Sequence, residues 1–180
     1  MLKESLFENY QNLLIKIDAF SSSITQRYQQ DLCCARGCSD CCQQELSLFP
    51  LEFFFLRHQI GSHPEVRRAR TDFSSDLSAA TACILLHKGS CLLYPYRPVI
   101  CRTHGLPLLI RPDQGEFRDC CPKNFFQRPL QTIPAADVLD LERINTLLAV
   151  LNRAFAVQTG IDPGQRIGLN QLFSDDFRIA

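Results

Sequence analysis

The chain has 180 residues, with 19 basic and 19 acidic side chains and no net charge. Hydrophobic residues make up 46% of it, which excludes intrinsic disorder as its main state and predicts a single domain over residues 1–180. The balanced charge argues against nucleic-acid binding, and no apolar run approaches the ~20 residues that a membrane-spanning helix needs.

Four segments are expected to be helical because their apolar side chains recur every three or four residues or because a proline is placed to open a helix. The first is a long amphipathic helix over about 3–31. Two more are expected. One covers 51–60, with Pro50 at the first helical position and Gly61 as its end, and the other covers 64–82 and is opened by Pro64. The last spans about 135–159 and ends at Gly160.

The remaining segments are expected to be short turns and strands. Residues 43–49 are predicted to be extended, and Pro98 is placed to open a short helix that ends at Gly105. Residues 106–111 and 116–119 flank a Pro-Asp-Gln-Gly turn and predict a hairpin, whereas the tail from Ile161 is predicted to be a loosely attached turn. The expected fold is mainly α with a small β-hairpin, a helical domain wrapped around a cysteine-rich, loop-rich segment.

Ten cysteines are far more than an ordinary intracellular chain of this length carries. The first ten residues include acidic side chains and no unbroken apolar core, so they do not have the pattern of a secretory signal peptide. We therefore expect a cytoplasmic protein in a reducing compartment, where thiols stay free or bind metal instead of forming disulfides.

The first cysteine cluster has the spacing Cys34-x3-Cys38-x2-Cys41-Cys42. A Cys-x2-Cys pair can place two thiolates around one tetrahedral metal, and the glycine before Cys38 lets the backbone turn. Neighbouring side chains diverge, so Cys41 and Cys42 are not expected to bind the same small ion. Cys33, which precedes Cys34, is expected to be a packing residue.

The second cluster consists of Cys83, Cys91 and Cys101, followed by the vicinal pair Cys120 and Cys121. Its spacing matches neither a zinc ribbon nor a simple ferredoxin motif. If both clusters bind one metal, then Cys38, Cys41 or Cys42, Cys91 and Cys101 must lie close together in space.

The segment Gly37-Cys38-Ser39-Asp40-Cys41-Cys42, followed by Cys83 and by Cys91-Leu-Leu-Tyr-Pro-Tyr-Arg-Pro-Val-Ile-Cys101-Arg102, resembles the YkgJ-like cysteine-cluster family. The resemblance covers about residues 30–122, which would form the metal-binding core between the flanking helices. It implies a zinc- or iron-chelating domain, and relatives are described as iron–sulfur oxidoreductases or flagellin lysine methylases. The three residues between Cys34 and Cys38 depart from the family's spacing of two.

Nine cysteines are therefore candidate metal ligands: Cys34, Cys38, Cys41, Cys42, Cys83, Cys91, Cys101, Cys120 and Cys121. The cofactor is expected to be zinc or iron, including a 4Fe–4S cluster, and there are enough thiols for two sites. Arg97 and Arg102 flank Cys101 and are expected to offset the negative charge of a thiolate centre from a second shell, although each could instead form an ordinary salt bridge. His104 follows Cys101 by three residues and could replace a thiolate.

Three functions remain open from the sequence. The first is an intracellular metal-binding protein with zinc or an iron–sulfur centre, with or without a redox role. The second is an enzyme, either an iron–sulfur oxidoreductase or a protein-modifying, lysine N-methylase-like enzyme. The third is a zinc scaffold for protein interaction, because closed structural sites and open catalytic sites use the same ligand types. The expected partners are a metal ion and a protein or redox partner, without nucleic acid or membrane.

Overall fold

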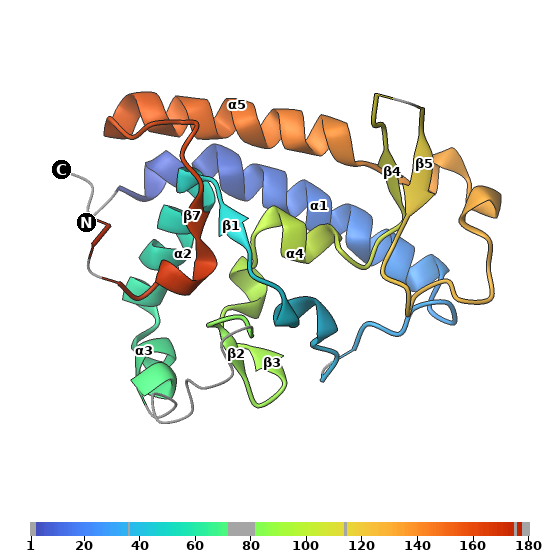
Figure 1. Cartoon of the computed structure of the whole chain (residues 1–180), viewed down its shortest axis with the longest axis horizontal. Coiled ribbons are helices and arrows are strands. Elements are labelled where there is room, and N and C mark those ends of the chain that lie inside the picture. Colours follow the sequence, from blue (N-terminus) through green and yellow to red (C-terminus); the bar gives the residue numbers. More distant parts are fainter. Residues whose placement is uncertain (1–2, 36, 72–81, 114, 175, 178–180) are drawn as a thin grey trace.

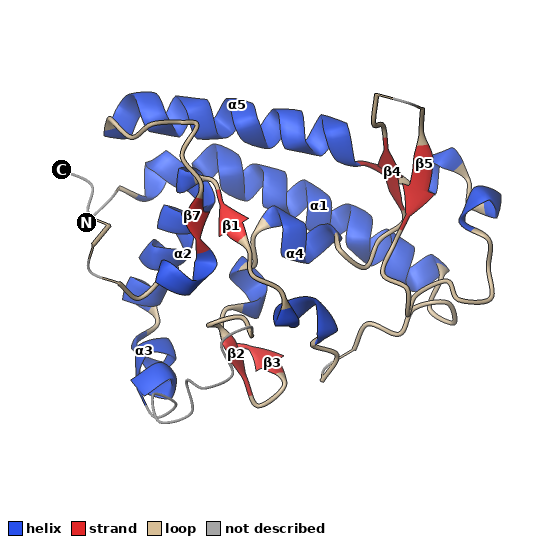
Figure 2. Ribbon diagram, viewed as in Figure 1, coloured by secondary structure: helices blue, strands red, loops and turns tan. Residues whose placement is uncertain are grey.

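The computed structural model describes residues 3–35, 37–71, 82–113, 115–174 and 176–177. Helices dominate the described part of the chain, and its strands are short, which confirms the mainly α fold class (Figures 1 and 2). None of the described helices is long and apolar enough to cross a membrane.

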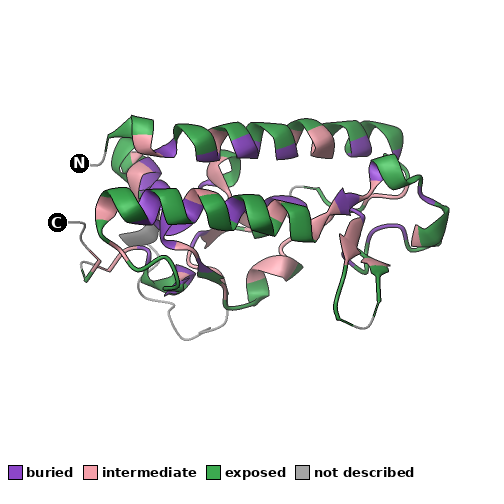
Figure 3. Cartoon of the chain, turned by 90° about the horizontal axis from the view of Figure 1, so that it is seen from above, coloured by how far each residue is buried: buried purple, intermediate pink, exposed green. Residues whose placement is uncertain are grey.

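Two long helices, α1 (Glu8–Arg27) and α5 (Leu141–Thr159), lie side by side along the molecule (Figures 1 and 3). Seen in Figure 3, they expose their outer faces and turn their buried residues inward, which is the amphipathic arrangement that their spacing predicts. A 3-10 turn, η1 (Glu4–Phe7), precedes α1. The predicted first helix was too long, because α1 ends at Arg27.

The ends of α5 have clear local causes. Asp140 caps its first turn by accepting a hydrogen bond of 3.1 Å from the backbone N–H of Arg143. Gly160 ends it with a φ of 73°, a left-handed conformation that suits glycine. The stop at Gly160 is confirmed, whereas the predicted start near residue 135 was wrong. The preceding segment forms the 3-10 turn η6 (Ala135–Asp137) and the strand β6 (Leu139–Asp140).

The helix α2 (Pro50–Ser62) has Pro50 at its first position, as predicted, but Gly61 lies inside its last turn instead of ending it. It is followed by α3 (Pro64–Thr71), which confirms the start of the helix predicted over 64–82. Residues 72–81 of that prediction lie outside the described part of the chain.

The main core lies between α1, α2 and α5. The Phe7 ring packs edge-on against Phe55 with centroids 5.5 Å apart and stacks on Phe155 at 5.9 Å. Phe7, Phe53, Phe55 and Phe155 are all at most 2% exposed. A second, smaller core joins the end of α1 to the 106–139 region through Ile24, Tyr28, Leu106, Phe125, Ile133 and Leu139.

Short strands attach the loops to this helical frame. β4 (Leu108–Ile110) pairs antiparallel with β5 (Phe117–Asp119), which confirms the predicted hairpin, and it also pairs in parallel with β6. β1 (Ser47–Leu48) confirms the predicted extended segment and pairs with β7 (Ile167–Gly168). The prediction of a loosely attached tail was therefore wrong, and Ile167, Leu169 and Leu172 are buried.

The cysteine-bearing loops contain a second hairpin, β2 (Leu86–His87) with β3 (Ser90–Cys91), and the short helix α4 (Val99–Thr103). α4 confirms the helix expected after Pro98, and it packs against α1. The start of α4 is fixed by buried Glu52 of α2. The Oε1 of Glu52 accepts hydrogen bonds from the Val99 N–H at 3.0 Å and from the Tyr10 hydroxyl at 3.3 Å. One carboxyl group thus links α1, α2 and α4.

The other short elements are 3-10 turns. They are η2 (Asp40–Gln43), η4 (Tyr94–Tyr96), η5 (Leu130–Thr132) and η7 (Leu169–Gln171).

Candidate metal centre

Six cysteines from three separate segments line one cavity of about 450 Å³. They are Cys38, Cys41, Cys42, Cys83, Cys91 and Cys101. The predicted proximity of residues 38–42 to Cys91 and Cys101 is therefore confirmed, although these segments lie far apart in the sequence. We call these six residues and the space between them the cysteine cavity.

Turns and hydrogen bonds between the segments hold the walls of the cysteine cavity together. The Cys83 N–H donates to the Cys42 carbonyl oxygen at 2.6 Å, which joins η2 to the second cysteine segment. The β2–β3 hairpin turns at Lys88 and Gly89, with φ values of 48° and 72°. A Cβ added at Gly89 would lie 3.7 Å from the Cα of Gly37, so two glycine turns meet at the rim.

Burial raises the pKa of five of the cavity thiols, those of Cys41, Cys42, Cys83, Cys91 and Cys101, which favours their protonated form. Burial raises the pKa of the Cys101 thiol well above its ordinary value, and repulsion from nearby thiolates, led by Cys83 and Cys91, raises it further. Burial also raises the pKa of Cys41 to about 11, with repulsion from Cys42 adding to it. Because thiolates are the metal-binding form, a metal that binds here must displace protons from these sulfurs.

Among the described residues that line the cysteine cavity, Arg97 is the cation. It lines the cavity, and its guanidinium lies 3.6 Å from the ring centroid of Tyr94. Its Nε donates to the Tyr94 carbonyl oxygen at 3.0 Å, and its Nη1 donates to the Cys101 carbonyl oxygen at 3.3 Å. Burial raises the pKa of Cys42 and Cys91, and the positive charge of Arg97 partly opposes that rise at both thiols.

Arg102 points elsewhere. It is buried, forms an ion pair with Asp18 of α1, and donates from Nε to the Arg97 carbonyl oxygen at 2.7 Å. It is not among the residues that line the cysteine cavity. Of the two arginines expected near a thiolate centre, the structure places Arg97 there, and it places Arg102 in the link between α4 and α1.

Cys34, Cys120 and Cys121 form a second group. Burial raises the pKa of Cys34, and repulsion from Cys121, Cys38 and Cys41 adds to that rise. Burial likewise raises the pKa of Cys120 to about 11, with contributions from Asp119, Cys121 and Cys34. The two parts of this group meet at Asn124, which donates to Cys34 Sγ at 3.2 Å and accepts on its backbone carbonyl oxygen from Cys120 Sγ at 3.5 Å.

Asn124 organises the second group, and the sequence analysis missed it. Its Oδ1 accepts from the Cys33 N–H at 2.9 Å, while its Nδ2 donates to the Gly105 carbonyl oxygen at 2.8 Å and to Cys34 Sγ at 3.2 Å. The two backbone partners fix the orientation of the amide. No spacing rule points to an asparagine three residues after a vicinal cysteine pair.

Gly105 completes the surroundings of the Cys34 sulfur. A Cβ at this position would lie 3.0 Å from Cys34 Sγ and 3.1 Å from Asn124 Nδ2. A side chain at this position would therefore force the Cys34 thiol and the Asn124 amide to shift by a few tenths of an ångström.

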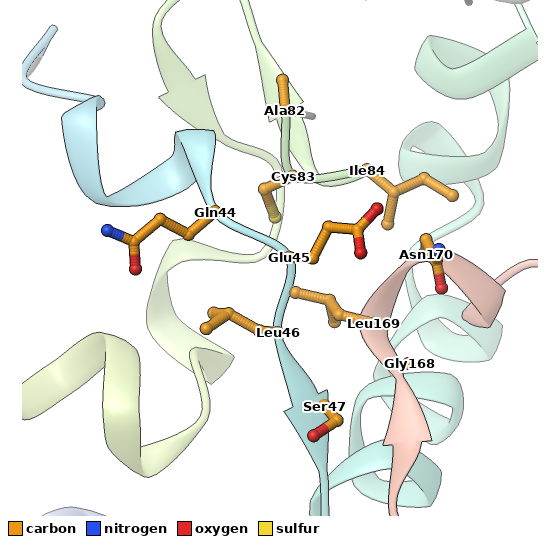
Figure 4. Close-up of a pocket in the computed structure, with 10 residues that line it drawn as sticks. All are labelled: Gln44, Glu45, Leu46, Ser47, Ala82, Cys83, Ile84, Gly168, Leu169 and Asn170. Carbon is orange, nitrogen blue, oxygen red and sulfur yellow. The ribbon is translucent and has the colours of Figure 1, made fainter. Parts of the chain in front are cut away.

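Cys83 separates the cysteine cavity from a smaller pocket of about 320 Å³. Figure 4 shows Cys83 in this pocket beside Gln44, Glu45 and Leu169. Cys83 and Leu169 line both spaces, so the buried tail also forms part of the wall of the cysteine cavity.

Two residues lie outside these groups. Cys33 is exposed, so the expectation that it packs in the interior was wrong. His104 lines a different groove, on the other side of α4, and is not part of the cysteine cavity. Within the described residues, no three His, Cys, Asp or Glu side chains are already arranged to hold a metal ion.

Comparisons with protein-family models, curated proteins and solved structures found no match to this chain. The resemblance to the YkgJ-like cysteine-cluster family therefore stays a prediction from the quoted motifs.

Proposed function

We propose that this chain is a metal-binding protein whose cysteine thiolates hold zinc or an iron–sulfur centre. The observation that supports it is the gathering of six cysteines from three segments around one cavity. Free cysteines often pack singly as small hydrophobic residues, but packing does not require segments so far apart to bring their thiols together. Thiolate donors favour zinc and iron–sulfur clusters over hard cations such as magnesium.

The two cysteine groups suggest a division of ligands. Cys42, Cys83, Cys91 and Cys101 would form one set of four thiolates, with Arg97 offsetting part of its negative charge. Cys34, Cys38 and Cys121 would belong to a second set, completed by Cys41 or Cys120. Since the side chains do not already converge on a point, binding requires the thiols to rotate toward the metal inside the cavity.

An iron–sulfur oxidoreductase is the second candidate. Electron transfer needs iron, because zinc has no accessible redox change. Tyr94, which lines the cysteine cavity, is 59% exposed, so one wall of the cavity reaches the surface where a redox partner could approach. Visible absorption that bleaches on reduction distinguishes this candidate from a zinc protein.

The proposal also bears on fold and location. The helices would wrap around the cysteine-rich segment, and the metal would order its loops. The location would be a reducing compartment such as the cytoplasm, where thiols stay available for a metal. The partners would be the metal ion and, for an iron–sulfur centre, a redox protein.

Metal analysis of variants tests the ligand assignment. Cys42→Ser and Cys101→Ser should each lower the metal content of anaerobically purified protein. Cys33→Ser is the matched control, because Cys33 is exposed and adjoins a proposed ligand without being one. Equal metal content in all three variants would remove the assignment of Cys42 and Cys101 as ligands.

A further inference from the structure

A groove of about 920 Å³ lies on the opposite side of α4 from the cysteine cavity. Ile100, Thr103 and His104 of α4 line the groove, whereas Cys101 of the same helix lines the cysteine cavity. In Figure 1, α4 lies between the β1–β7 pair at one end and the β4–β5 hairpin at the other. The groove is thus a separate site that needs no cysteine.

The lining of the groove is mainly apolar. Its walls include Leu48, Phe49, Ile100, Leu108, Ile110 and Leu148. Ile100 is 48% exposed, so a large aliphatic side chain faces the open groove. Five charged side chains also line it, Glu52, Arg111, Asp119, Glu142 and Arg166, so a ligand that fits here needs an apolar body and a charged group.

Arg166 supplies a fixed positive charge at the β1–β7 end. Its Nη2 donates to the Ser47 carbonyl oxygen at 2.6 Å, and its guanidinium lies 4.3 Å from the ring centroid of Phe49. No carboxylate among the described residues forms an ion pair with Arg166. Burial raises the pKa of Glu52, which also lines the groove, and the positive charge of Arg166 is among the effects that oppose that rise.

The arginine at the other end of the groove is already neutralised. Arg111 forms an ion pair of 2.6 Å with Asp140 and a longer one of 3.5 Å with Glu116. Asp119 and Glu142 also line that end. An anionic group is therefore attracted to Arg166 and not to Arg111.

We propose that this groove binds an organic carboxylate with an elongated apolar body, its carboxylate on Arg166 and its body along Ile100 and Leu108. The guanidinium has N–H donors left after its bond to Ser47, and a planar guanidinium pairs well with a carboxylate. The contacts with Phe49 and Ser47 hold it in place before the ligand arrives, which lowers the entropy cost of binding.

Displacement of the fluorescent dye anilinonaphthalenesulfonate by decanoate tests the proposal on the full-length protein. Decanoate should displace the dye more effectively than decanol, which has the same chain without the charge. Arg166→Gln should weaken decanoate binding by about tenfold or more, because a charged hydrogen-bonded pair is lost. The matched control is Arg143→Gln, an exposed arginine that does not line the groove.

A second variant keeps the test independent of the charge. Ala149→Phe fills the groove while it leaves Arg166 in place, and it should also weaken decanoate binding. Equal binding of decanol and decanoate, unchanged affinity in Ala149→Phe, or equal losses in the two arginine variants would each overturn the proposal. Binding of an acidic peptide but not of decanoate would overturn it too. Since no cysteine is involved, these results are separate from the metal content.

Discussion

Replacing Asn124 with alanine should destabilise the protein by about 1–3 kcal/mol. Asn124 is 3% exposed and bonds to Cys33, Cys34 and Gly105. A buried group left without its partner costs about 1–3 kcal/mol, but Cys33 and Cys34 are exposed and water can replace their lost partner. The loss therefore falls mainly on the Gly105 carbonyl group.

Urea unfolding of the metal-free protein, followed by circular dichroism, measures this loss. Asn12→Ala is the matched control, because Asn12 is exposed on α1, and it should change the free energy of unfolding by less than about 0.5 kcal/mol. If Asn124→Ala also stays within that range, the three hydrogen bonds do not hold these loops together. In that case the account of the second cysteine group fails.

Three further predictions concern the rest of the fold. Burial raises the pKa of Glu52, so its contribution to the free energy of unfolding is greatest below its unfolded pKa and is lost as the pH rises through the raised value. Glu52→Gln should therefore flatten the dependence of the urea midpoint on pH. Identical pH profiles of the variant and the wild-type protein would contradict this. Gly160→Ala should lower the free energy of unfolding by about 1 kcal/mol, because the φ of 73° strains a residue with a side chain. No atom lies within 4 Å of the added Cβ, so a clash does not contribute. An unchanged melting temperature would refute backbone strain at this position. Cys101→Ser should keep most of the helical circular dichroism signal but increase proteolysis within residues 83–121. Proteolysis of the control Cys33→Ser should be unchanged. Complete unfolding of Cys101→Ser would show that the helices depend on the metal centre.

The helices were the most predictable part of the fold. Apolar spacing and the prolines at 50 and 64 located α1, α2 and α5 and the start of α3, because these signals are local. Their ends were less predictable. The start of α5 is displaced to Leu141 because Leu139 and Asp140 pair with β4, and a pairing between distant segments leaves no mark on local periodicity.

The tail shows the same limit. The sequence showed only a short apolar patch at Leu169, Leu172 and Phe173, and the pairing of β7 with β1 explains why Leu169 and Leu172 are buried. At the candidate site, the hypothesis that both cysteine clusters share one metal predicted correctly that Cys38, Cys91 and Cys101 lie close together. Spacing could not identify Asn124, because its role depends on three backbone segments that meet only in the folded chain.

Metal analysis of the anaerobically purified full-length protein tests the central claim most directly. The proposal predicts zinc or iron at one or more equivalents per chain, retained in Cys33→Ser and reduced in Cys101→Ser. The cysteines would then act as ligands in the cavity that they line. Only trace zinc and iron in the wild-type protein would contradict the claim and leave the gathered thiols as packing residues.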